Sequence, residues 1–317
     1  MHPTCIHRLL LCLLTLAGVG YFGPLLAGAE EPIAVITELK PNRGEVHIRL
    51  PGKHDWERPG PLQSLYEGSQ IRASKDALVV ILFMDGVRSI TVEEKNSPYE
   101  LRATVASQES GTGGRLKEIA SFLLGKKKLP TYVPLAVRGA KRPLTPLSPR
   151  NTKLLSTAPT FYWMATGGIK SALLLYDSSG LVWKEELAET RLPYPATTPL
   201  LRPGVEYRWA LETPGFPVEW ASFKTLDDEA ASEAQERLRS LQGLELPKTT
   251  FAIIQAGFLL SHELFHDGRE ILTAAIEADP SEPALHLLLG DIYEKTGLQA
   301  LAAKEYGEAE FLAKGNQ

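Results

Sequence analysis

The C-terminal part of the chain repeats with a period of 34 residues, and this repeat restricts the possible folds more than any other feature. The matching positions hold small or large apolar residues: Ala256 with Gly290, Leu259 with Tyr293, Gly268 with Ala302, Leu272 with Tyr306 and Ala275 with Ala309. Apolar residues within each copy recur at spacings of three and four, which indicates amphipathic helices. Pro280 closes the first copy. Each copy therefore predicts a helical hairpin that stacks on the other.

The second copy carries a fuller set of residues at defined spacings: Leu289-Gly290, Tyr293, Gly297, Ala302, Tyr306 and Ala309. They resemble the tetratricopeptide repeat, although His286 stands where its leading Trp is usual. The resemblance covers about residues 249–315 and implies stacked hairpins with a concave groove for peptides. Acidic residues at helical spacing precede the repeat. We expect a helical domain over 228–317, with a first helix at 228–242.

The first copy contains His262-Glu263-Leu264-Phe265-His266, which spells the zinc-peptidase signature. That chemistry requires both histidines on one helical face, with the glutamate as general base. In the register of the repeat, the first helix ends near His262 and the second begins around 265–267, with Gly297 opposite Glu263. The signature therefore straddles a corner, and its possible third ligands, Glu282 and His286, lie beyond Pro280. A zinc metallopeptidase is a remote alternative, and we expect no catalytic, cofactor-binding or metal-binding residues.

Residues 30–104 contain six short stretches in which apolar and polar residues alternate or apolar residues are continuous. Gly, Pro and Asp separate the stretches, and this pattern predicts an all-β domain. The stretches are IAVITELK, GEVHIRL, SQIRAS, ALVVILFM, RSITVEE and YELRATV. The order of residues resembles the FecR-type domain, through Gly44-Glu45-Val46, Leu65, Gly68, Ile71, Ala77, Val79, Ile81, Asp85-Gly86, Ile90 and Val92. This resemblance implies an envelope β domain used for protein contacts. Too few residues precede the N-terminal apolar run to support an anti-sigma role.

Residues 151–226 are also β-rich, with five predicted strands and a DSSG turn between the second and third. Leu201, Pro203-Gly204 and Tyr207 resemble the tyrosine corner of fibronectin type III and immunoglobulin-like sandwiches. The resemblance implies a β-sandwich. Its tryptophans are Trp163, Trp183, Trp209 and Trp220. They fill the core of the sandwich or line a glycan-binding face. An exposed pair such as Trp183 and Trp220 would favour the glycan-binding interpretation.

Residues 105–150 are rich in Gly, Pro and basic side chains and predict a linker with one short helix. From 105 to 153 there are ten Lys or Arg and two Glu, with Lys126-Lys127-Lys128 as the densest point. Leu116, Ile119, Ala120 and Leu123 fall on one helical face. This helix lies on an anionic membrane surface or packs against a neighbouring domain with its lysines in water.

The N-terminal residues 1–29 combine an apolar run with small residues at its end, which predicts a cleaved secretory signal. An uncleaved inner-membrane anchor is the alternative. Both cysteines, Cys5 and Cys12, would leave with the signal, so the mature chain would hold no disulfide. An exported chain without disulfides suits the bacterial periplasm.

These patterns together predict a non-enzymatic, multidomain β + α protein: an exported adaptor or scaffold without a cofactor. We expect envelope proteins as partners, with groove contacts from Gln255, Leu259, Asp291 and Glu294. Residues 227–317 hold 17 acidic and 7 basic side chains, which favours a partner with a basic surface. A cell-wall glycan binder is the alternative function, and the basic linker is a candidate contact for peptidoglycan or an anionic membrane. No nucleic-acid partner is expected, and the oligomeric state is left open.

Overall fold

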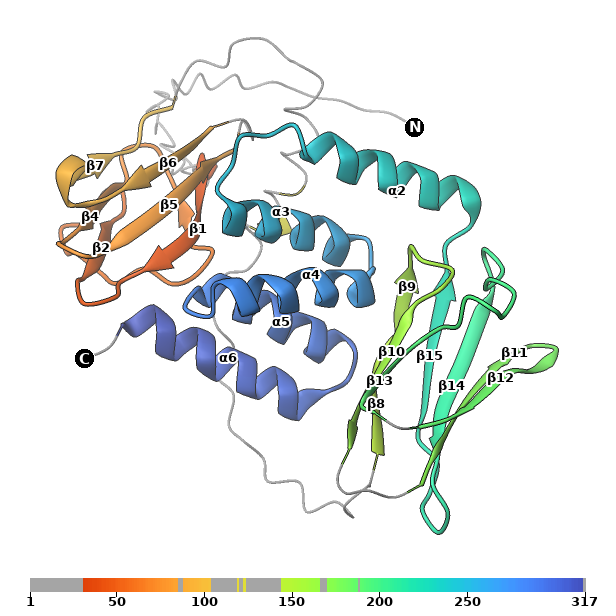
Figure 1. Cartoon of the computed structure of the whole chain (residues 1–317). Helices are drawn as coiled ribbons and strands as arrows, with labels where there is room; N and C mark the ends of the chain where they lie inside the picture. Colours follow the sequence, from red (N-terminus) through yellow and green to blue (C-terminus); the bar gives the residue numbers. More distant parts are fainter. Residues whose placement is uncertain are drawn as a thin grey trace, which may run out of the picture. The chain divides into compact units, whose positions relative to one another are not determined.

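The computed structural model describes residues 31–84, 88–103, 119, 122–123, 144–165, 170–187 and 189–315. Within these ranges fifteen strands come first and five helices, α2 to α6, follow them, with one 3₁₀ turn at Glu94–Asn96 (Figure 1). The predicted combination of β regions with a helical C-terminal end is confirmed. Several predicted features lie outside the described residues, namely the signal segment 1–29, Asp85-Gly86, Leu116, Ala120 and Lys126-Lys127-Lys128.

The first β region is built from two antiparallel sheets, with the strand orders β3-β1-β5-β6 and β2-β4-β7. Its strands are β1 Ala34–Lys40, β2 Val46–Arg49, β3 Ser64–Leu65, β4 Gln70–Ala73, β5 Leu78–Phe83, β6 Ser89–Val92 and β7 Tyr99–Glu100. The six predicted strands are present, and β3 is an addition to them. Aliphatic side chains, among them Ile36, Ile48, Ile71 and Ile81, form a core for this region.

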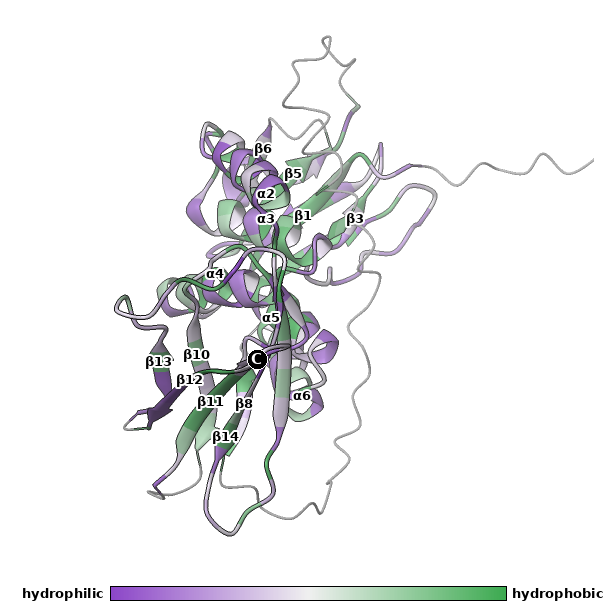
Figure 2. Ribbon diagram, turned by 90° about the vertical axis from the view of Figure 1, so that its right-hand side faces the viewer, coloured by the Kyte–Doolittle hydropathy of each residue, from purple (hydrophilic) through white to green (hydrophobic). Residues whose placement is uncertain are grey.

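Strands β1 and β5 are buried along almost their whole length. A strand that is covered on both faces has no polar side to alternate with, which explains the continuous apolar run in the sequence of β5 (Figure 2). Ile36 and Ile81 belong to the core of the β region, whereas Val35, Leu62 and Leu82 belong to the core of the C-terminal helices. The first β region and the helices therefore share a hydrophobic core.

A β-bulge interrupts β1 between Ile36 and Glu38. The pairing with β5 steps from Ile36 opposite Ile81 to Glu38 opposite Val80, which leaves Thr37 as the extra residue. Thr37 and Glu38 are neighbours in the sequence, yet both contact the same helical residue, Thr250. The bulge thus directs two consecutive side chains toward the helices.

The second β region comprises two sheets with the orders β13-β10-β8 and β12-β11-β14-β15-β9. Its strands are β8 Leu144–Ser148, β9 Thr152–Leu154, β10 Thr160–Ala165, β11 Ala172–Asp177, β12 Gly180–Glu186, β13 Arg191–Pro193, β14 Glu206–Glu212 and β15 Trp220–Thr225. The five predicted strands correspond to β10, β11, β12, β14 and β15. All pairs are antiparallel except β15 with β9, which is parallel.

Aromatic side chains fill the core between these two sheets. Phe161 packs edge-on against Trp209, with the ring centroids 5.0 Å apart. The backbone N–H of Arg202 donates a hydrogen bond of 2.8 Å to the Tyr207 hydroxyl, and Leu201 beside it is buried. The Tyr207 side chain therefore bonds to the turn that precedes its own strand, β14.

Strand β8 lies inside the stretch that the sequence predicts as linker. Pro146 and Pro149 make this segment look irregular, but β8 is an edge strand that pairs with β10 alone among the described strands. An edge strand tolerates proline because one row of its backbone groups has no strand to bond. The stretch predicted as linker therefore contributes a strand to the second β region, whose first described residue is Leu144.

The helices are α2 Asp228–Leu241, α3 Lys248–Ser261, α4 Phe265–Ala278, α5 Pro283–Lys295 and α6 Gln299–Lys314. The pairs α3–α4 and α5–α6 are the two predicted hairpins, and α2 is the predicted preceding helix. The Asp227 side chain caps α2 by accepting from the Ala230 N–H at 2.9 Å. No helix among the described residues is long and apolar enough to cross a bilayer.

Candidate protein-binding surface

The small residues of the repeat sit where the helices approach most closely. A Cβ atom at Gly290 of α5 would lie 2.6 Å from the Tyr306 ring of α6, and one at Gly268 of α4 would lie 2.9 Å from Leu260 of α3. A side chain at Gly290 would therefore have to displace the Tyr306 ring, whereas at Gly268 the end of the Leu260 side chain would have to move. These two glycines of the repeat therefore lie at the contact between the two helices of each hairpin.

The four predicted groove residues differ in their exposure. Gln255 is half-buried and Glu294 is exposed, whereas Asp291 is buried and Leu259 lies in the core at 2% exposure. The Tyr306 hydroxyl lies 2.8 Å from Asp291 Oδ1 and 3.0 Å from Glu294 Oε2, so Asp291 is committed to a contact within the second hairpin. Gln255 and Glu294 are the two of this set that offer side-chain surface to a partner.

The zinc-peptidase signature straddles the corner between α3 and α4, as its register predicts. Helix α3 ends at Ser261 and α4 begins at Phe265, and Glu263 between them has a φ of +62°. His262 Nδ1 lies 2.9 Å from the Phe258 carbonyl oxygen, and Glu263 is paired with Lys153 at 2.8 Å. Among the described residues, no group of three His, Cys, Asp or Glu side chains is placed to hold a metal ion.

His266 faces the second β region instead of a metal site. Its ring is 2% exposed, and Nδ1 lies 2.8 Å from the Ser148 hydroxyl of β8. Burial, and to a lesser extent the nearby Arg269 charge, lowers the pKa of His266 to about 3. The imidazole is therefore neutral at physiological pH and serves as a packing and hydrogen-bonding group.

The corner between α3 and α4 docks onto β9. The Glu263 carbonyl oxygen accepts from the Lys153 N–H at 2.9 Å and from Thr152 Oγ1 at 3.1 Å. At the next corner, the Thr296 carbonyl oxygen accepts from Arg150 Nε at 3.0 Å. Equivalent corners of the two hairpins thus bind one edge of the second β region through backbone carbonyl groups.

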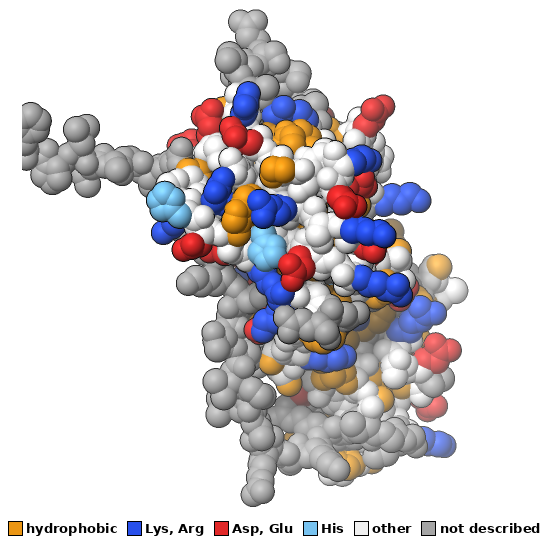
Figure 3. Space-filling view, turned by 90° about the vertical axis from the view of Figure 1, so that its left-hand side faces the viewer, with side chains coloured by type: hydrophobic (Ala, Val, Ile, Leu, Met, Phe, Trp, Pro, Cys, Tyr) orange, Lys and Arg blue, Asp and Glu red, His pale blue; other side chains and the backbone are white. Residues whose placement is uncertain are grey.

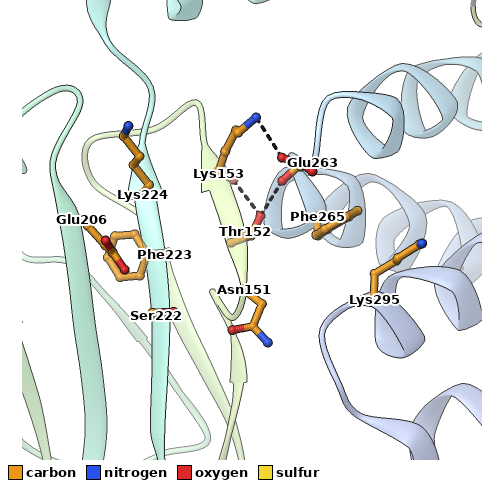
Figure 4. A pocket seen from close by; sticks show the side chains of 10 residues that line it. All are labelled: Asn151, Thr152, Lys153, Glu206, Ser222, Phe223, Lys224, Glu263, Phe265 and Lys295. Atoms are coloured by element: carbon orange, nitrogen blue, oxygen red, sulfur yellow. Dashed lines mark hydrogen bonds and ion pairs between the residues drawn. The ribbon is translucent and has the colours of Figure 1, made fainter.

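A cavity of about 430 Å³ lies beside these corners (Figure 4). It is lined by Asn151, Thr152, Lys153, Glu206, Ser222, Phe223, Lys224, Glu263, Phe265 and Lys295. Figure 4 shows Lys153 of β9 reaching Glu263 across this space. The lining contains no histidine or cysteine, and its carboxylate from the signature is already paired. The cavity therefore has the character of a polar cleft between packed elements.

A second set of polar contacts joins the helices to β1. The Glu38 carboxylate accepts from the Thr250 N–H at 3.0 Å and from its hydroxyl at 2.6 Å. Glu282, which is fully buried, caps α5 by accepting from the Ala284 N–H at 3.1 Å and also accepts from the Leu39 N–H at 2.9 Å. Burial raises the pKa of Glu282 well above its ordinary value, although both N–H groups act in the opposite direction.

An ion pair completes this contact. Lys40 Nζ lies 2.6 Å from Asp279 Oδ2, and it is also 3.3 Å from Glu38 Oε2. The Thr249 hydroxyl donates to the same Asp279 oxygen at 2.9 Å. Asp279 follows the last residue of α4, so the end of the first hairpin and the start of the second both bind β1.

The outer surface of the first β region carries Lys and Arg side chains interspersed with Asp and Glu (Figure 3). Two guanidinium groups lie near the Trp56 ring, that of Arg72 at 4.3 Å from the centroid and that of Arg49 at 5.0 Å. Arg72 lies on β4 and Arg49 on β2, which are paired strands. No sequence motif indicated this grouping of Trp56 with two arginines.

The linker helix contacts α3. Residues 119 and 122–123 are helical, and Ile119 and Leu123 are buried at 5% and 0% exposure in the core of the helices. For these two residues, packing against a neighbouring domain is the alternative that the structure supports.

The four tryptophans of the second β region divide between core and surface. Trp163, Trp183 and Trp209 are buried, whereas Trp220 is 44% exposed. The exposed pair Trp183 and Trp220 is therefore not present. Instead, Tyr176 lies beside Trp220 with ring centroids 5.6 Å apart, and Arg208 lies 5.5 Å from the Trp220 ring.

No protein-family model matches the chain, and no curated protein matches its sequence.

Proposed function

We propose that the chain is a non-catalytic adaptor of the bacterial cell envelope, which binds other envelope proteins through its helical hairpins and its β regions. One observation carries the proposal: the two hairpins are held at both ends by contacts with β regions, while Gln255 and Glu294 keep accessible surface. A helical pair braced in this way is a rigid platform, and rigid platforms lose little entropy when a partner binds.

The resemblance of each of the three modules to a known family supports the same adaptor role. The hairpin residues Gly290 and Tyr306 make the close contact that resembles the packing of tetratricopeptide repeats. The first and second β regions resemble a FecR-type domain and an immunoglobulin-like sandwich, respectively. All three are modules used for contacts between proteins rather than for chemistry.

The partner of this proposal has a basic surface, and the adaptor works after export to the periplasm, free or anchored by its N-terminal apolar segment. Residues 227–317 carry ten more acidic than basic side chains. Charge of this sign accelerates encounter with a basic protein and disfavours nucleic acid or other acidic partners. Glu294 is the predicted contact residue that contributes to this charge at an exposed position.

The test is site-specific photo-crosslinking in intact cells, with a photoreactive residue at position 255 or 294 of the full chain. Truncation after residue 227 is unsuitable, since it would expose Val35, Leu62 and Leu82. Position 236 of α2 is the control, because Glu236 is also exposed on a helix but lies outside the hairpins.

We expect the same partner to be crosslinked from positions 255 and 294 but not from 236. The charge reversal Glu294→Lys in the chain with the photoreactive residue at 255 should reduce that product about tenfold, while Glu236→Lys leaves it unchanged. If adducts form from 236 and from neither hairpin position, the hairpins are not the partner-binding surface.

A glycan-binding role is the second candidate, favoured by the exposed Trp220 and its neighbours Tyr176 and Arg208. Aromatic faces stack on sugar rings, and a guanidinium group donates hydrogen bonds to hydroxyls. Retention of the full chain on purified peptidoglycan tests it. If this role holds, Trp220→Ala should lower retention about tenfold, whereas Leu181→Ala, another exposed apolar residue, should leave it unchanged. Equal retention of both variants and the wild type would exclude Trp220 as a glycan contact.

A further inference from the structure

The sheet β2-β4-β7 has an outward face that carries two arginines side by side. Along β2 and β4 every second residue is buried in the core of the first β region, so the residues between them point outward. These are His47 and Arg49 of β2 and Gln70 and Arg72 of β4. The strand pairing places Arg49 opposite Gln70 and His47 opposite Arg72. Two arginines from paired strands therefore share one face.

The Trp56 ring restricts both guanidinium groups. Backbone hydrogen bonds between Ile48 and Glu57 hold the loop that follows β2 against the edge of that strand, and Trp56 lies in this loop. The guanidinium carbon of Arg72 lies 4.3 Å from the centroid of the indole ring, and that of Arg49 lies 5.0 Å from it. An arginine that is already stacked on an aromatic ring loses less conformational entropy when its N–H groups bind a ligand.

Neither guanidinium group is paired with a carboxylate among the residues that the structure describes. Arg49 donates to the neutral carboxamide oxygen of Gln70, and Arg72 is exposed apart from its contact with the indole ring. By contrast, Arg58 of the same β region pairs with Glu45 at 3.5 Å. Two positive charges beside one ring repel each other, so an anion bound between them would relieve that repulsion.

We propose that this surface, formed by Arg49, Trp56 and Arg72, binds an acidic peptide segment of a partner protein. Carboxylates of the peptide accept from the N–H groups of both arginines in charge-assisted hydrogen bonds. Trp and Arg are also among the residues that most often dominate the binding free energy of protein interfaces. This assignment rests on the proposed adaptor function, and it gives the first β region a partner segment opposite in charge to the basic partner of the hairpins.

Two other kinds of ligand fit this surface less well. A sugar ring needs an open aromatic face for stacking, and two guanidinium groups already lie over the Trp56 ring. An anionic membrane is recognised by clusters of several Lys and Arg, whereas Lys and Arg alternate with Asp and Glu on this face (Figure 3). Two adjacent cations on a surface of mixed charge suit a short acidic segment better.

The experiment measures the binding of a rhodamine-labelled synthetic peptide, in which Glu alternates with Ala, to the full chain by fluorescence anisotropy. We expect Arg49→Gln with Arg72→Gln to weaken binding at least about tenfold. Glutamine retains part of the aliphatic side chain, so this loss reports the charge. The control, Arg43→Gln with Lys75→Gln, removes the same charge from exposed positions of the same β region and should change the affinity less than about twofold.

Three results would overturn the proposal. The first is a wild-type chain that does not bind the Glu peptide, or that binds a peptide with Gln in place of Glu equally well. The second is an equal loss of affinity in the control variant, because the overall surface charge would then explain the binding. The third is a wild-type chain that binds vesicles of phosphatidylglycerol through the two arginines but does not bind the peptide, which would assign the surface to a lipid headgroup.

The variant Trp56→Leu separates the placement of the two cations from their charge. It keeps both arginines but removes the ring that restricts them, so the affinity for the peptide should fall about threefold. Unchanged affinity would show that the ring is not part of the surface. Circular dichroism checks that each variant is folded, and Arg72→Gln alone, at an exposed position, replaces the double variant if that one is not.

The peptide measurement and the crosslinking experiment fail independently. The peptide binds at the first β region and is measured with purified protein, so a negative crosslinking result at positions 255 and 294 would leave it unchanged. Loss of peptide binding would in turn leave the hairpins as the candidate surface for a basic partner.

Discussion

The helical hairpins contact the two β regions through different chemistry. Toward the first β region the acceptors are buried side chains, the carboxylates of Glu38 and Glu282. Toward the second β region the acceptors at the corners are the backbone carbonyls of Glu263 and Thr296. A carbonyl contact survives a change of side chain, whereas a buried carboxylate cannot be replaced without leaving its donors unsatisfied. The first contact therefore depends on residue identity, whereas the two corner bonds of the second depend on the conformation of the corners and are supplemented by the side-chain contacts of His266 and Asp267.

Among these predictions, the substitution Glu282→Ala should lower the unfolding free energy most. It removes the acceptor for two N–H groups, those of Leu39 and Ala284, which are buried with it. Leaving two buried donors unsatisfied should cost about 3 kcal/mol of unfolding free energy. Urea denaturation followed by circular dichroism measures it, with exposed Glu245→Ala as the control, which should stay within about 0.5 kcal/mol. A loss of unfolding free energy for Glu282→Ala as small as that of the control would mean that apolar packing, and not the buried carboxylate, stabilises the contact with β1.

The second prediction concerns pH and the contact with the second β region. Asp267 accepts from the Leu155 N–H at 3.3 Å, and burial is the main cause that raises its pKa to about 7. Its stabilising contribution is therefore present below the unfolded pKa near 3.8 and is lost as the pH rises to 7. Neutral His266 has the opposite sign: its contribution is present above pH 6.5 and is lost as the pH falls toward 3.

In the wild type, Asp267 makes the unfolding free energy fall with rising pH between pH 4 and 6.5, and His266 makes it rise over the same range. Asp267→Asn removes the first of these two effects, so the unfolding free energy of the variant should rise by about 2 kcal/mol relative to the wild type between pH 4.5 and 6.5. Thermal unfolding at a series of pH values measures the difference. Parallel profiles for the two proteins would contradict the assignment of Asp267 as a buried, proton-binding group.

The smallest effect is expected at the corner itself, for Glu263→Gly. Relief of a positive φ contributes about 1 kcal/mol, while the lost ion pair with Lys153 is exposed and contributes at most about 1 kcal/mol. The net change in unfolding free energy should therefore stay within about 0.5 kcal/mol. At the equivalent corner, Gly297→Ala places a side chain at a φ of +81° and should cost about 1 kcal/mol. A large loss for Glu263→Gly would show that its side chain, not its backbone, makes the contact.

The repeat explains why this part of the fold could be predicted. The period of 34 places Glu263 opposite Gly297, and glycine at one corner predicts a left-handed turn at both. Both residues do have positive φ. The break between α3 and α4 follows from the sequence alone, and so does the separation of His262 from His266.

The contact with β1 could not be predicted in the same way. Glu38 occupies a position in an alternating stretch where a charged residue indicates the solvent-facing side. It is buried because the bulge after Ile36 turns it toward Thr250, and a bulge has no local sequence signal here. Leu259 and Asp291 were expected in the groove for a related reason: a helical period identifies a face but does not say what covers it.

The shared core has a consequence for the order in which the chain can fold. Val35 and Leu82 are synthesised before the helices that cover them, and the bond between Leu39 and Glu282 spans 243 positions. Until the last helices have been synthesised, one face of the sheet that contains β1 is exposed to solvent and can contact other strands or chains. The interval between the two events depends on the speed of synthesis, so the chain is most prone to aggregation before its C-terminal helices are complete.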